Sequence, residues 1–403
     1  MRIALASIHP RPLSGQIEGL VGLAQAIESR GHHVAVVSAF PNDTLLSSER
    51  LKLTSAHRWS FVDYPVRVAR IVTRLIALAP HVDLIQLNLP TPAFALLGDM
   101  VQALVRVPVI VSYEAHLVNP RDLLRYDRLR EAPLFYVPRL LINNHLAARI
   151  VLNRAARYLV SSKFQKNELV DLGIAPKRIS CLPNIMPRDK LAPVPREQAR
   201  AKLNLPSGRL ITYIGHYNHV KGVDVLVDAF RQLATRLEDV CLVLAWSGLG
   251  KSRQVEEVLG HPQFSQRVRQ LGRVNVAELL SATDVAVLPY RLTIGQAVFP
   301  ATLLEALAAH VPVVTSDLPL LRELTGEGQT ALLAPPENPA ALAAMIERVL
   351  NDTDLARHMI AAQQSWGLQM HPDNAVRAYE HIYRQVLDEQ ARVLQPARDR
   401  ASV

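Results

Sequence analysis

Short apolar runs alternate with amphipathic segments along the first half of the chain. The runs at residues 2–7, 32–40, 83–88, 107–113, 158–162 and 179–182 predict buried strands. Apolar residues at helical spacing predict helices at about 17–30, 92–105 and 164–172. Strands that alternate with helices indicate a parallel sheet with helices on both faces.

The same alternation resumes after residue 208. Strands are predicted at 210–215, 240–246, 285–289 and 311–314, and helices at 222–236, around 303–308 and at 373–394. A glycine loop is predicted at 247–250, directly after the second of these strands. Between the two halves lie four prolines, at positions 183, 187, 193 and 195, which is typical of a linker.

These patterns predict an α/β protein with two doubly wound, Rossmann-like domains that face a cleft. The expected boundaries are 1–185 for the first domain, 186–208 for the linker and 209–370 for the second domain. A C-terminal helix at 371–395 is expected to pack back on the first domain, followed by a flexible tail at 396–403. In such folds ligands bind at the carboxyl ends of the strands.

Composition narrows the class of protein. A chain of 403 residues is longer than one hydrophobic core usually supports, so two domains are expected. The chain has no apolar run long enough to span a membrane, and its start is too short for a signal peptide, so a cytoplasmic protein is expected. Cys181 and Cys241 lie in apolar runs and are predicted to be buried thiols. A formal charge of +9 indicates anionic partners, with phosphates, an anionic membrane surface and nucleic acid all open.

A single carboxylate, Glu305, lies in an otherwise apolar helical segment that begins after Pro300 and leads into the strand at 311–314. Two interpretations follow from the spacing. Glu305 is either an exposed residue on the polar side of an amphipathic helix or a ligand-binding carboxylate that points into a cleft.

Several motifs, in order, carry a resemblance to a known family. They are Ser14-Gly-Gln-Ile-Glu18, Val160-Ser-Ser-Lys-Phe-Gln-Lys-Asn-Glu168, Leu182-Pro-Asn184, Tyr213-Ile-Gly-His-Tyr-Asn-His-Val-Lys-Gly222, Leu271-Gly272, Asp284-Val-Ala-Val-Leu-Pro289 and Leu304-Glu-Ala-Leu-Ala-Ala-His-Val-Pro-Val-Val314. Over nearly its whole length the chain resembles the retaining nucleotide-sugar glycosyltransferases of family 4 (glycosyl transferases group 1). That resemblance implies the GT-B fold.

The resemblance also implies a set of site residues. The second signature glutamate of the family falls on Glu305 and would bind the nucleotide ribose, whereas the first falls on Ala297, which removes one contact to the donor sugar. The family's arginine is replaced by His216. The implied donor-binding residues are Gly15, Gln16, His216, Lys221, Val274, Ala301, Thr302 and Glu305, and the implied catalytic residues are Glu305, Glu114 and His116.

Chemistry supports some of these assignments more than others. Lys221 precedes a helix, where the N-terminal amides already favour an anion such as a diphosphate, although a lysine there is often only solvated surface. His216 could add a donor, with a charge if phosphate raises its pKa. Glu114 or His116 would orient the sugar or the acceptor hydroxyl, or else form a polar strand end.

Two further features bear on metals and membranes. Asp352 and Asp354 have the Asp-x-Asp spacing of some metal sites, but their place between two predicted helices favours a helix cap, and no metal is expected. The region 117–158 holds eight arginines among apolar and aromatic residues. One interpretation is that this region contacts the inner face of an anionic membrane, and the other is that it is a helix that covers the domain with its arginines in water. No nucleic-acid motif accompanies it.

The prediction is a cytoplasmic, metal-independent, retaining glycosyltransferase that moves a sugar from a nucleoside-diphosphate donor to a hydroxyl of a lipid or glycan. Its only cofactor-like molecule is the nucleotide sugar itself. One alternative is a non-catalytic nucleotide-sugar or glycan-binding relative, indicated by Ala297. A second alternative, a two-domain receptor for small ligands, is disfavoured because no export signal is present.

Overall fold

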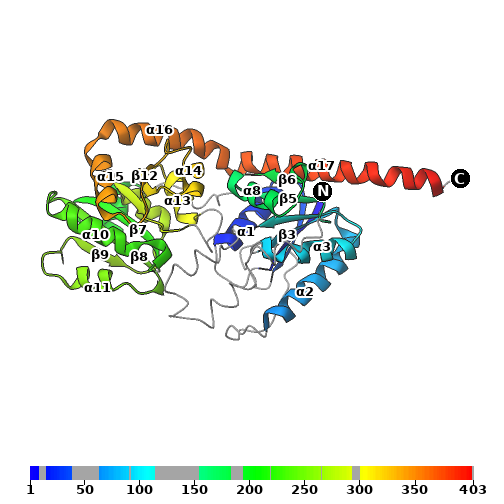
Figure 1. Ribbon diagram of the computed structural model, residues 1–403, viewed down its shortest axis with the longest axis horizontal. Coiled ribbons are helices and arrows are strands. Elements are labelled where there is room, and N and C mark those ends of the chain that lie inside the picture. The colour runs from blue at the N-terminus through cyan, green and yellow to red at the C-terminus, as the bar shows by residue number, and fades with distance from the viewer. Residues whose placement is uncertain are drawn as a thin grey trace. The chain divides into compact units, whose positions relative to one another are not determined.

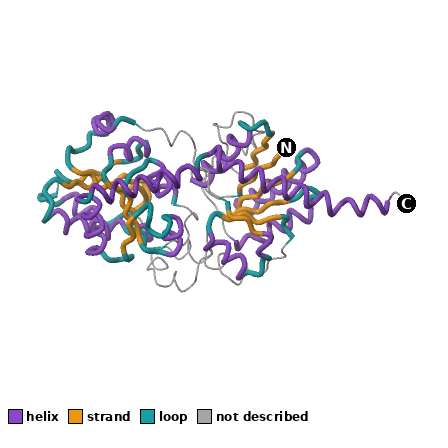
Figure 2. The backbone as a smooth tube through the Cα atoms, turned by 90° about the horizontal axis from the view of Figure 1, so that it is seen from above, coloured by secondary structure: helices purple, strands orange, loops and turns teal. Residues whose placement is uncertain are grey.

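The computed structural model describes residues 1–8, 15–38, 63–89, 92–113, 154–182, 194–217, 219–264, 266–292 and 300–401. The chain divides into two compact units (Figure 1). The first, here unit 1, comprises 1–187, 295–298 and 370–403, and the second, unit 2, comprises 188–294 and 299–369. Each unit contains one six-stranded sheet of parallel strands flanked by helices, which confirms the predicted fold class (Figure 2).

The sheet of unit 1 has the strand order β2-β1-β3-β4-β5-β6. Its strands are β1 (Arg2–Ser7), β2 (His33–Ser38), β3 (Leu84–Leu89), β4 (Val109–Tyr113), β5 (Arg157–Val160) and β6 (Ile179–Cys181). The helices that precede the last one are α1 (Gly15–Glu28), α2 (Asp63–Leu78), α3 (Ala95–Leu104) and α8 (Lys163–Asp171), with short 3-10 turns at Ala79–His81, Pro92–Phe94 and Pro176–Arg178.

Alternation along the strands divides the core of unit 1 into two layers. Ala4 and Ala6 of β1 belong to a cluster with Leu75 of α2 and Val101 of α3. Ile3 and Leu5, on the opposite face of the same strand, belong to a second cluster with residues of α1. Because successive side chains of a strand point to opposite faces, one apolar strand supplies both layers.

The last helix, α17 (Pro372–Ala401), belongs to unit 1 although it follows unit 2 in the sequence. Its apolar residues pack with α1, and Tyr383 reaches the sheet, where its hydroxyl donates a hydrogen bond to Gln86 Oε1 of β3 at 2.6 Å. Glu380 of the same helix accepts a hydrogen bond from Arg30 at 2.6 Å. The helix therefore completes one face of the first sheet.

The sheet of unit 2 has the strand order β12-β11-β10-β7-β8-β9. Its strands are β7 (Arg209–Tyr217), β8 (Val240–Gly250), β9 (Val268–Leu271), β10 (Val285–Leu288), β11 (Val313–Ser316) and β12 (Leu332–Ala334). The helices are α9 (Arg196–Lys202), α10 (Val223–Ala234), α11 (Arg253–Gly260), α12 (Val276–Ala282), α13 (Ala301–Ala308), α14 (Pro319–Leu324), α15 (Pro339–Asn351) and α16 (Thr353–Met370), and His219–Lys221 forms a 3-10 turn, η5.

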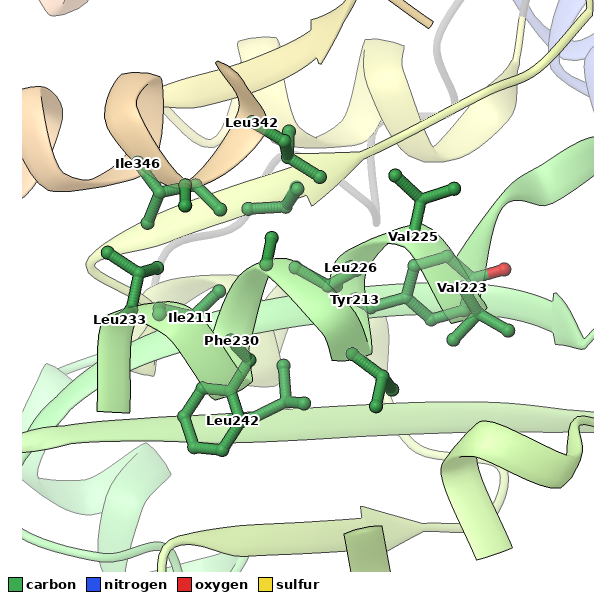
Figure 3. Packing of buried hydrophobic residues seen from close by; sticks show 14 of the residues in the cluster. Ile211, Tyr213, Val223, Val225, Leu226, Phe230, Leu233, Leu242, Leu342 and Ile346 are labelled. Atoms are coloured by element: carbon green, nitrogen blue, oxygen red, sulfur yellow. The ribbon is translucent and has the colours of Figure 1, made fainter. Parts of the chain in front are cut away.

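The largest core of unit 2 lies between its sheet and two helices. Figure 3 shows Leu226 and Phe230 of α10 beside Ile211 and Leu242 of the sheet, with Ile346 of α15 from the other helix. All five side chains are inaccessible to solvent. This packing fixes the start of α10, and hence the turn η5 that precedes it, relative to strand β7.

Three predicted elements differ from the structure. The glycine loop at 247–250 is the end of β8, because the long β7 pairs Tyr217 with Gly250 across an irregularity in the register. Part of the predicted linker at 186–208 forms α9, which packs on α12 within unit 2. The tail predicted as flexible at 396–403 is helical as far as Ala401.

The prediction for the cysteines was correct for one residue and wrong for the other. Cys241 lies in β8, which has a strand on each side, and is buried, whereas Cys181 is exposed. Cys181 ends β6, which is the edge strand of its sheet. An edge strand has one side that no other strand covers, so its apolar sequence does not ensure burial. Neither cysteine forms a disulfide.

Candidate functional site

Three side chains lie near the carboxyl ends of β7 and β10, which are neighbours in the sheet of unit 2. The sequence predicted two of them, Lys221 and Glu305, as site residues, but not the third, Tyr290. Lys221 ends the turn η5 after β7, Tyr290 lies two residues beyond β10, and Glu305 lies in α13. The Lys221 ammonium is 4.5 Å from the centre of the Tyr290 ring and 3.4 Å from its hydroxyl oxygen. This end of a parallel sheet is where ligands bind in doubly wound folds.

Gly222 makes the close approach of Lys221 to Tyr290 possible. Its backbone is left-handed, with φ 66°, and a Cβ atom there would lie 1.9 Å from the carbonyl oxygen of Pro289. Only glycine has neither the conformational penalty nor the clash. The backbone just before α10 therefore lies directly against the segment that carries Tyr290.

Glu305 is buried, with 6% of its surface exposed, among the apolar residues of α13. The interpretation of Glu305 as an exposed residue on a polar helix face is therefore wrong. Burial raises the pKa of the Tyr290 hydroxyl, and the negative charge of Glu305 raises it further. Glu305 thus acts electrostatically on Tyr290, which also contacts Lys221, so the structure brings the two predicted residues to one site.

Burial lowers the pKa of Lys221 to about 7. A buried ammonium loses hydration, and this loss favours the neutral amine unless an anion compensates it. An anion bound next to Lys221 would raise its pKa again. The position of Lys221 is therefore suited to a negatively charged ligand, and it is not the fully solvated surface lysine that the sequence left open.

His216 lies within β7 near its carboxyl end and is half-buried. Its Nδ1 atom is hydrogen-bonded to the Ser247 hydroxyl of β8, and its carbonyl accepts a hydrogen bond from the Tyr213 hydroxyl at 2.6 Å. These contacts hold the imidazole at the same end of the sheet as Lys221. Sequence patterns do not identify Ser247, because a partner on a neighbouring strand has no fixed sequence separation.

The other predicted donor-binding residues of unit 2 have different surroundings. Ala301 is exposed and Thr302 half-buried in the first turn of α13, whose N-cap residue, Pro300, makes no side-chain cap. Amides of a first helical turn favour an anion. Val274 packs against the apolar cluster beneath α9 and α12, so its observed contacts belong to the core of unit 2.

The structure does not describe the side chains of several predicted site residues. Glu114, His116 and Ala297 lie outside the described residues, as does most of the arginine-rich region at 117–158. Gly15 and Gln16 form the start of α1, where the backbone alone is described. Their assigned roles stay predictions.

The Asp352-x-Asp354 spacing has a structural role. The Asp352 carboxylate accepts a hydrogen bond from the Leu355 amide at 2.9 Å, which is the helix-capping contact that the sequence favoured. Across the described ranges, no group of three or more His, Cys, Asp or Glu side chains is placed to hold a metal ion. The same ranges contain no helix that is both long and apolar enough to cross a membrane.

The chain is similar to known glycosyltransferases in sequence and in fold. Over 182 residues it is 30% identical to the phosphatidyl-myo-inositol mannosyltransferase of Mycobacterium leprae, a match that spans 45% of this chain and 46% of that relative. The structure resembles a sucrose-phosphate synthase from Thermosynechococcus elongatus, with a TM-score of 0.75 at 22% identity over 96% of this chain and 99% of the other.

A third likeness is to HepE of Anabaena in complex with UDP, with a TM-score of 0.67 at 17% identity over 96% of this chain and 99% of that one. In sequence, the chain matches less than half the length of the M. leprae mannosyltransferase and of two further curated relatives. Two family models match the chain in succession, Glycosyltransferase Family 4 at 14–190 and Glycosyl transferases group 1 at 208–352. Because these models together cover most of both units, the chain belongs to the family 4 glycosyl transferases of group 1.

Proposed function

We propose that the protein is a retaining glycosyltransferase that moves a sugar from a nucleoside-diphosphate donor to a hydroxyl group of a lipid or glycan acceptor. The observation that carries the proposal is the meeting of Lys221, Tyr290 and Glu305 at the carboxyl ends of β7 and β10. A half-buried cation against the Tyr290 ring and a buried carboxylate that acts electrostatically on the same residue match the two halves of a nucleoside diphosphate, its phosphates and its ribose.

In this proposal Lys221 binds the diphosphate and Glu305 accepts hydrogen bonds from the ribose hydroxyls. The reaction breaks the bond between the anomeric carbon and a phosphate oxygen, and the electron pair leaves with the diphosphate. Lys221 and the first-turn amides of α13 stabilise the charge that grows there, which is an electrostatic contribution to the rate. The acceptor oxygen bonds to the anomeric carbon on the same face, and its proton passes to the departing phosphate oxygen.

The comparisons support the donor class more than the acceptor. HepE of Anabaena, whose fold this chain shares, was solved with UDP. The M. leprae relative is named for mannosyl transfer to phosphatidyl-myo-inositol. A lipid acceptor is therefore proposed beside a glycan acceptor, with an anionic membrane as the surface on which a lipid would be reached. No metal is assigned, because the proposal gives the charge of the leaving group to protein atoms.

The binding part of the proposal is tested with Lys221→Ala and Glu305→Ala. Each should weaken the affinity for a nucleoside diphosphate by roughly 1.5–3 kcal/mol, the range for a hydrogen bond to a charged group. Calorimetry with UDP, GDP and ADP measures the affinity, and circular dichroism verifies the fold. Lys251→Ala and Glu256→Ala, at exposed positions of the same unit, are the controls. Unchanged affinity in both site variants would remove the proposed donor site.

A second candidate function is binding of nucleotide sugars without transfer. It is favoured by Ala297, which stands where the family has its first signature glutamate. Transfer and binding are separated by incubating the purified protein with a nucleotide sugar that it binds and measuring the release of nucleoside diphosphate. Release that Lys221→Ala abolishes supports catalysis, whereas tight binding with no release, with or without acceptor, supports the second candidate.

A further inference from the structure

Arg291 is a buried arginine directly after Tyr290, and the sequence patterns did not single it out. Its side chain is 8% exposed. It forms a two-point ion pair with Asp224, in which Nη1 donates to Oδ1 at 2.7 Å and Nη2 donates to Oδ2 at 2.6 Å. Its Nε donates to Glu337 at 3.1 Å. A buried guanidinium with this many partners holds a fixed geometry.

The remaining contacts of Arg291 are with the backbone of η5, the turn that ends in Lys221. Nη1 also donates to the carbonyl oxygen of His219 at 2.9 Å, and the Arg291 amide donates to the carbonyl oxygen of Val220 at 2.9 Å. Asp224, the carboxylate partner, lies in the first turn of α10. Arg291 therefore binds the chain on both sides of Lys221.

The chain around Lys221 is also fixed from the side of Pro289. Gly222 lies against the Pro289 carbonyl, and Tyr290 lies under the Lys221 ammonium. Residues 289–291 thus contact the Lys221 turn at its backbone, at its side chain and at the helix that follows. Lys221 has a flexible four-carbon side chain, so its position over Tyr290 depends on how firmly the backbone beneath it is held.

We infer that Arg291 is a positioning residue for the diphosphate-binding cation: it holds η5 and the first turn of α10 so that Lys221 projects over Tyr290 toward the ligand. The inference rests on the proposed function, because Lys221 is the residue through which Arg291 acts. Arg291 itself makes no contact with the ligand in this account. It follows that the effect of Arg291 on binding requires Lys221 and concerns the phosphates rather than the nucleoside.

The decisive test is a double-mutant cycle on the full chain. Arg291→Lys keeps a positive charge but loses the two-point ion pair, and it should weaken binding of the tightest of UDP, GDP and ADP by about tenfold. In a Lys221→Ala background the same change should alter affinity less than about twofold, because the residue to be positioned is absent. Binding of the corresponding nucleoside should change less than about twofold in either background.

Two further variants make the cycle robust. Asp224→Asn removes the carboxylate charge while keeping nearly the same shape, and it should reproduce the Lys221-dependent loss of affinity. It therefore replaces Arg291→Lys in the cycle if Arg291→Lys does not fold. Arg253→Lys, in an exposed ion pair of the same unit, is the matched arginine control and should leave affinity unchanged. Thermal unfolding of each variant shows whether a loss of affinity merely accompanies a loss of structure.

The outcomes distinguish the inference from the function on which it rests. Equal losses from Arg291→Lys with and without Lys221, or an equal loss for the nucleoside, would show a general structural role and overturn the inference alone. If Lys221→Ala itself leaves diphosphate affinity unchanged, the proposed donor site fails, and the positioning role fails with it.

Discussion

Lys221 is a residue whose charge depends on its ligand. Burial brings its pKa to about 7 in the unliganded protein, close to the pH at which enzymes are commonly assayed. A bound diphosphate would raise that pKa through its negative charge. Binding is therefore coupled to proton uptake by this one side chain, which makes affinity a function of pH.

The sign of the pH dependence follows from the linkage. Because the pKa of Lys221 is higher in the complex than the value of about 7 without ligand, affinity should be greatest below pH 7 and should decline as pH rises from 7 through the pKa of the complex. Calorimetry from pH 6 to 9 with a nucleoside-diphosphate sugar measures it. The intact sugar nucleotide has no terminal phosphate, which would otherwise ionise near pH 6.

Two variants assign the effect to its residue. Lys221→Arg keeps a charge that does not titrate in this range, so its affinity should be nearly independent of pH. His216→Gln should keep the wild-type pH profile above pH 7. If His216→Gln flattens the profile and Lys221→Arg does not, the histidine, as the sequence first suggested, is the group that titrates.

At the scale of single residues, sequence reasoning identified the groups that lie within motifs and missed those that act across strands. Lys221 and Glu305 stand at fixed positions in motifs of the family. Tyr290 contacts Lys221, and Arg291 binds the backbone of the turn that ends in Lys221, from the end of a different strand. No periodicity or spacing encodes such contacts. The burial of Glu305 was equally undetermined, because a lone carboxylate in an apolar helix fits both an exposed and an internal position.

At the scale of elements, the turn before α10 depends on one glycine. Gly222→Ala should destabilise unit 2 by roughly 2–4 kcal/mol, from the left-handed backbone and from the clash with the Pro289 carbonyl. Gly272→Ala is the control, because a Cβ atom there meets no atom within 4 Å. Urea unfolding measures both. Equal stability of the two variants would contradict the close approach of η5 to β10.

The attachment of α17 to the first sheet gives a second prediction at this scale. Tyr383→Phe removes the hydrogen bond to Gln86 and leaves a buried amide oxygen without that donor, at a cost of roughly 1–3 kcal/mol of unfolding free energy. Tyr379→Phe, at a buried position one helical turn away, leaves the bond between Tyr383 and Gln86 intact and should cost less. A Tyr383→Phe variant as stable as the wild type would show that the helix is held by its apolar face alone.

Most strands and helices were predictable because apolar periodicity reports burial directly. Two of the exceptions have local physical causes. The Ser247–Gly250 segment has the composition of a loop, yet it is strand because the longer β7 offers it a partner at Tyr217. The proline-rich stretch hid α9, a helix whose charged sequence packs through few apolar residues, among them the buried Ala199.

At the scale of the whole molecule, the two units differ in how the chain builds them. Unit 2 is formed by residues 188–369 apart from 295–298, with its own sheet and core. Unit 1 requires two distant segments, because α17 supplies Tyr383 and Val376 to the cluster on one face of its sheet. The resemblance to the GT-B fold suggested this arrangement, whereas apolar periodicity alone shows that the last helix is amphipathic and not which sheet it covers.

This difference predicts opposite behaviour of two fragments. A fragment of residues 188–369 should fold alone and bind a nucleoside diphosphate in a manner that depends on Lys221, because Lys221, Tyr290 and Glu305 all lie within it.

A fragment of residues 1–187 should be unstable alone, because the apolar face of α1 and its sheet loses the cover of α17. Addition of a peptide of residues 370–401 should restore cooperative unfolding of that fragment, and the same peptide with Tyr383→Ala should restore less, since it loses both a buried ring and the bond to Gln86. Circular dichroism and urea unfolding measure each case. If residues 1–187 unfold cooperatively without the peptide, α17 is an accessory to the first unit and not a part of its core.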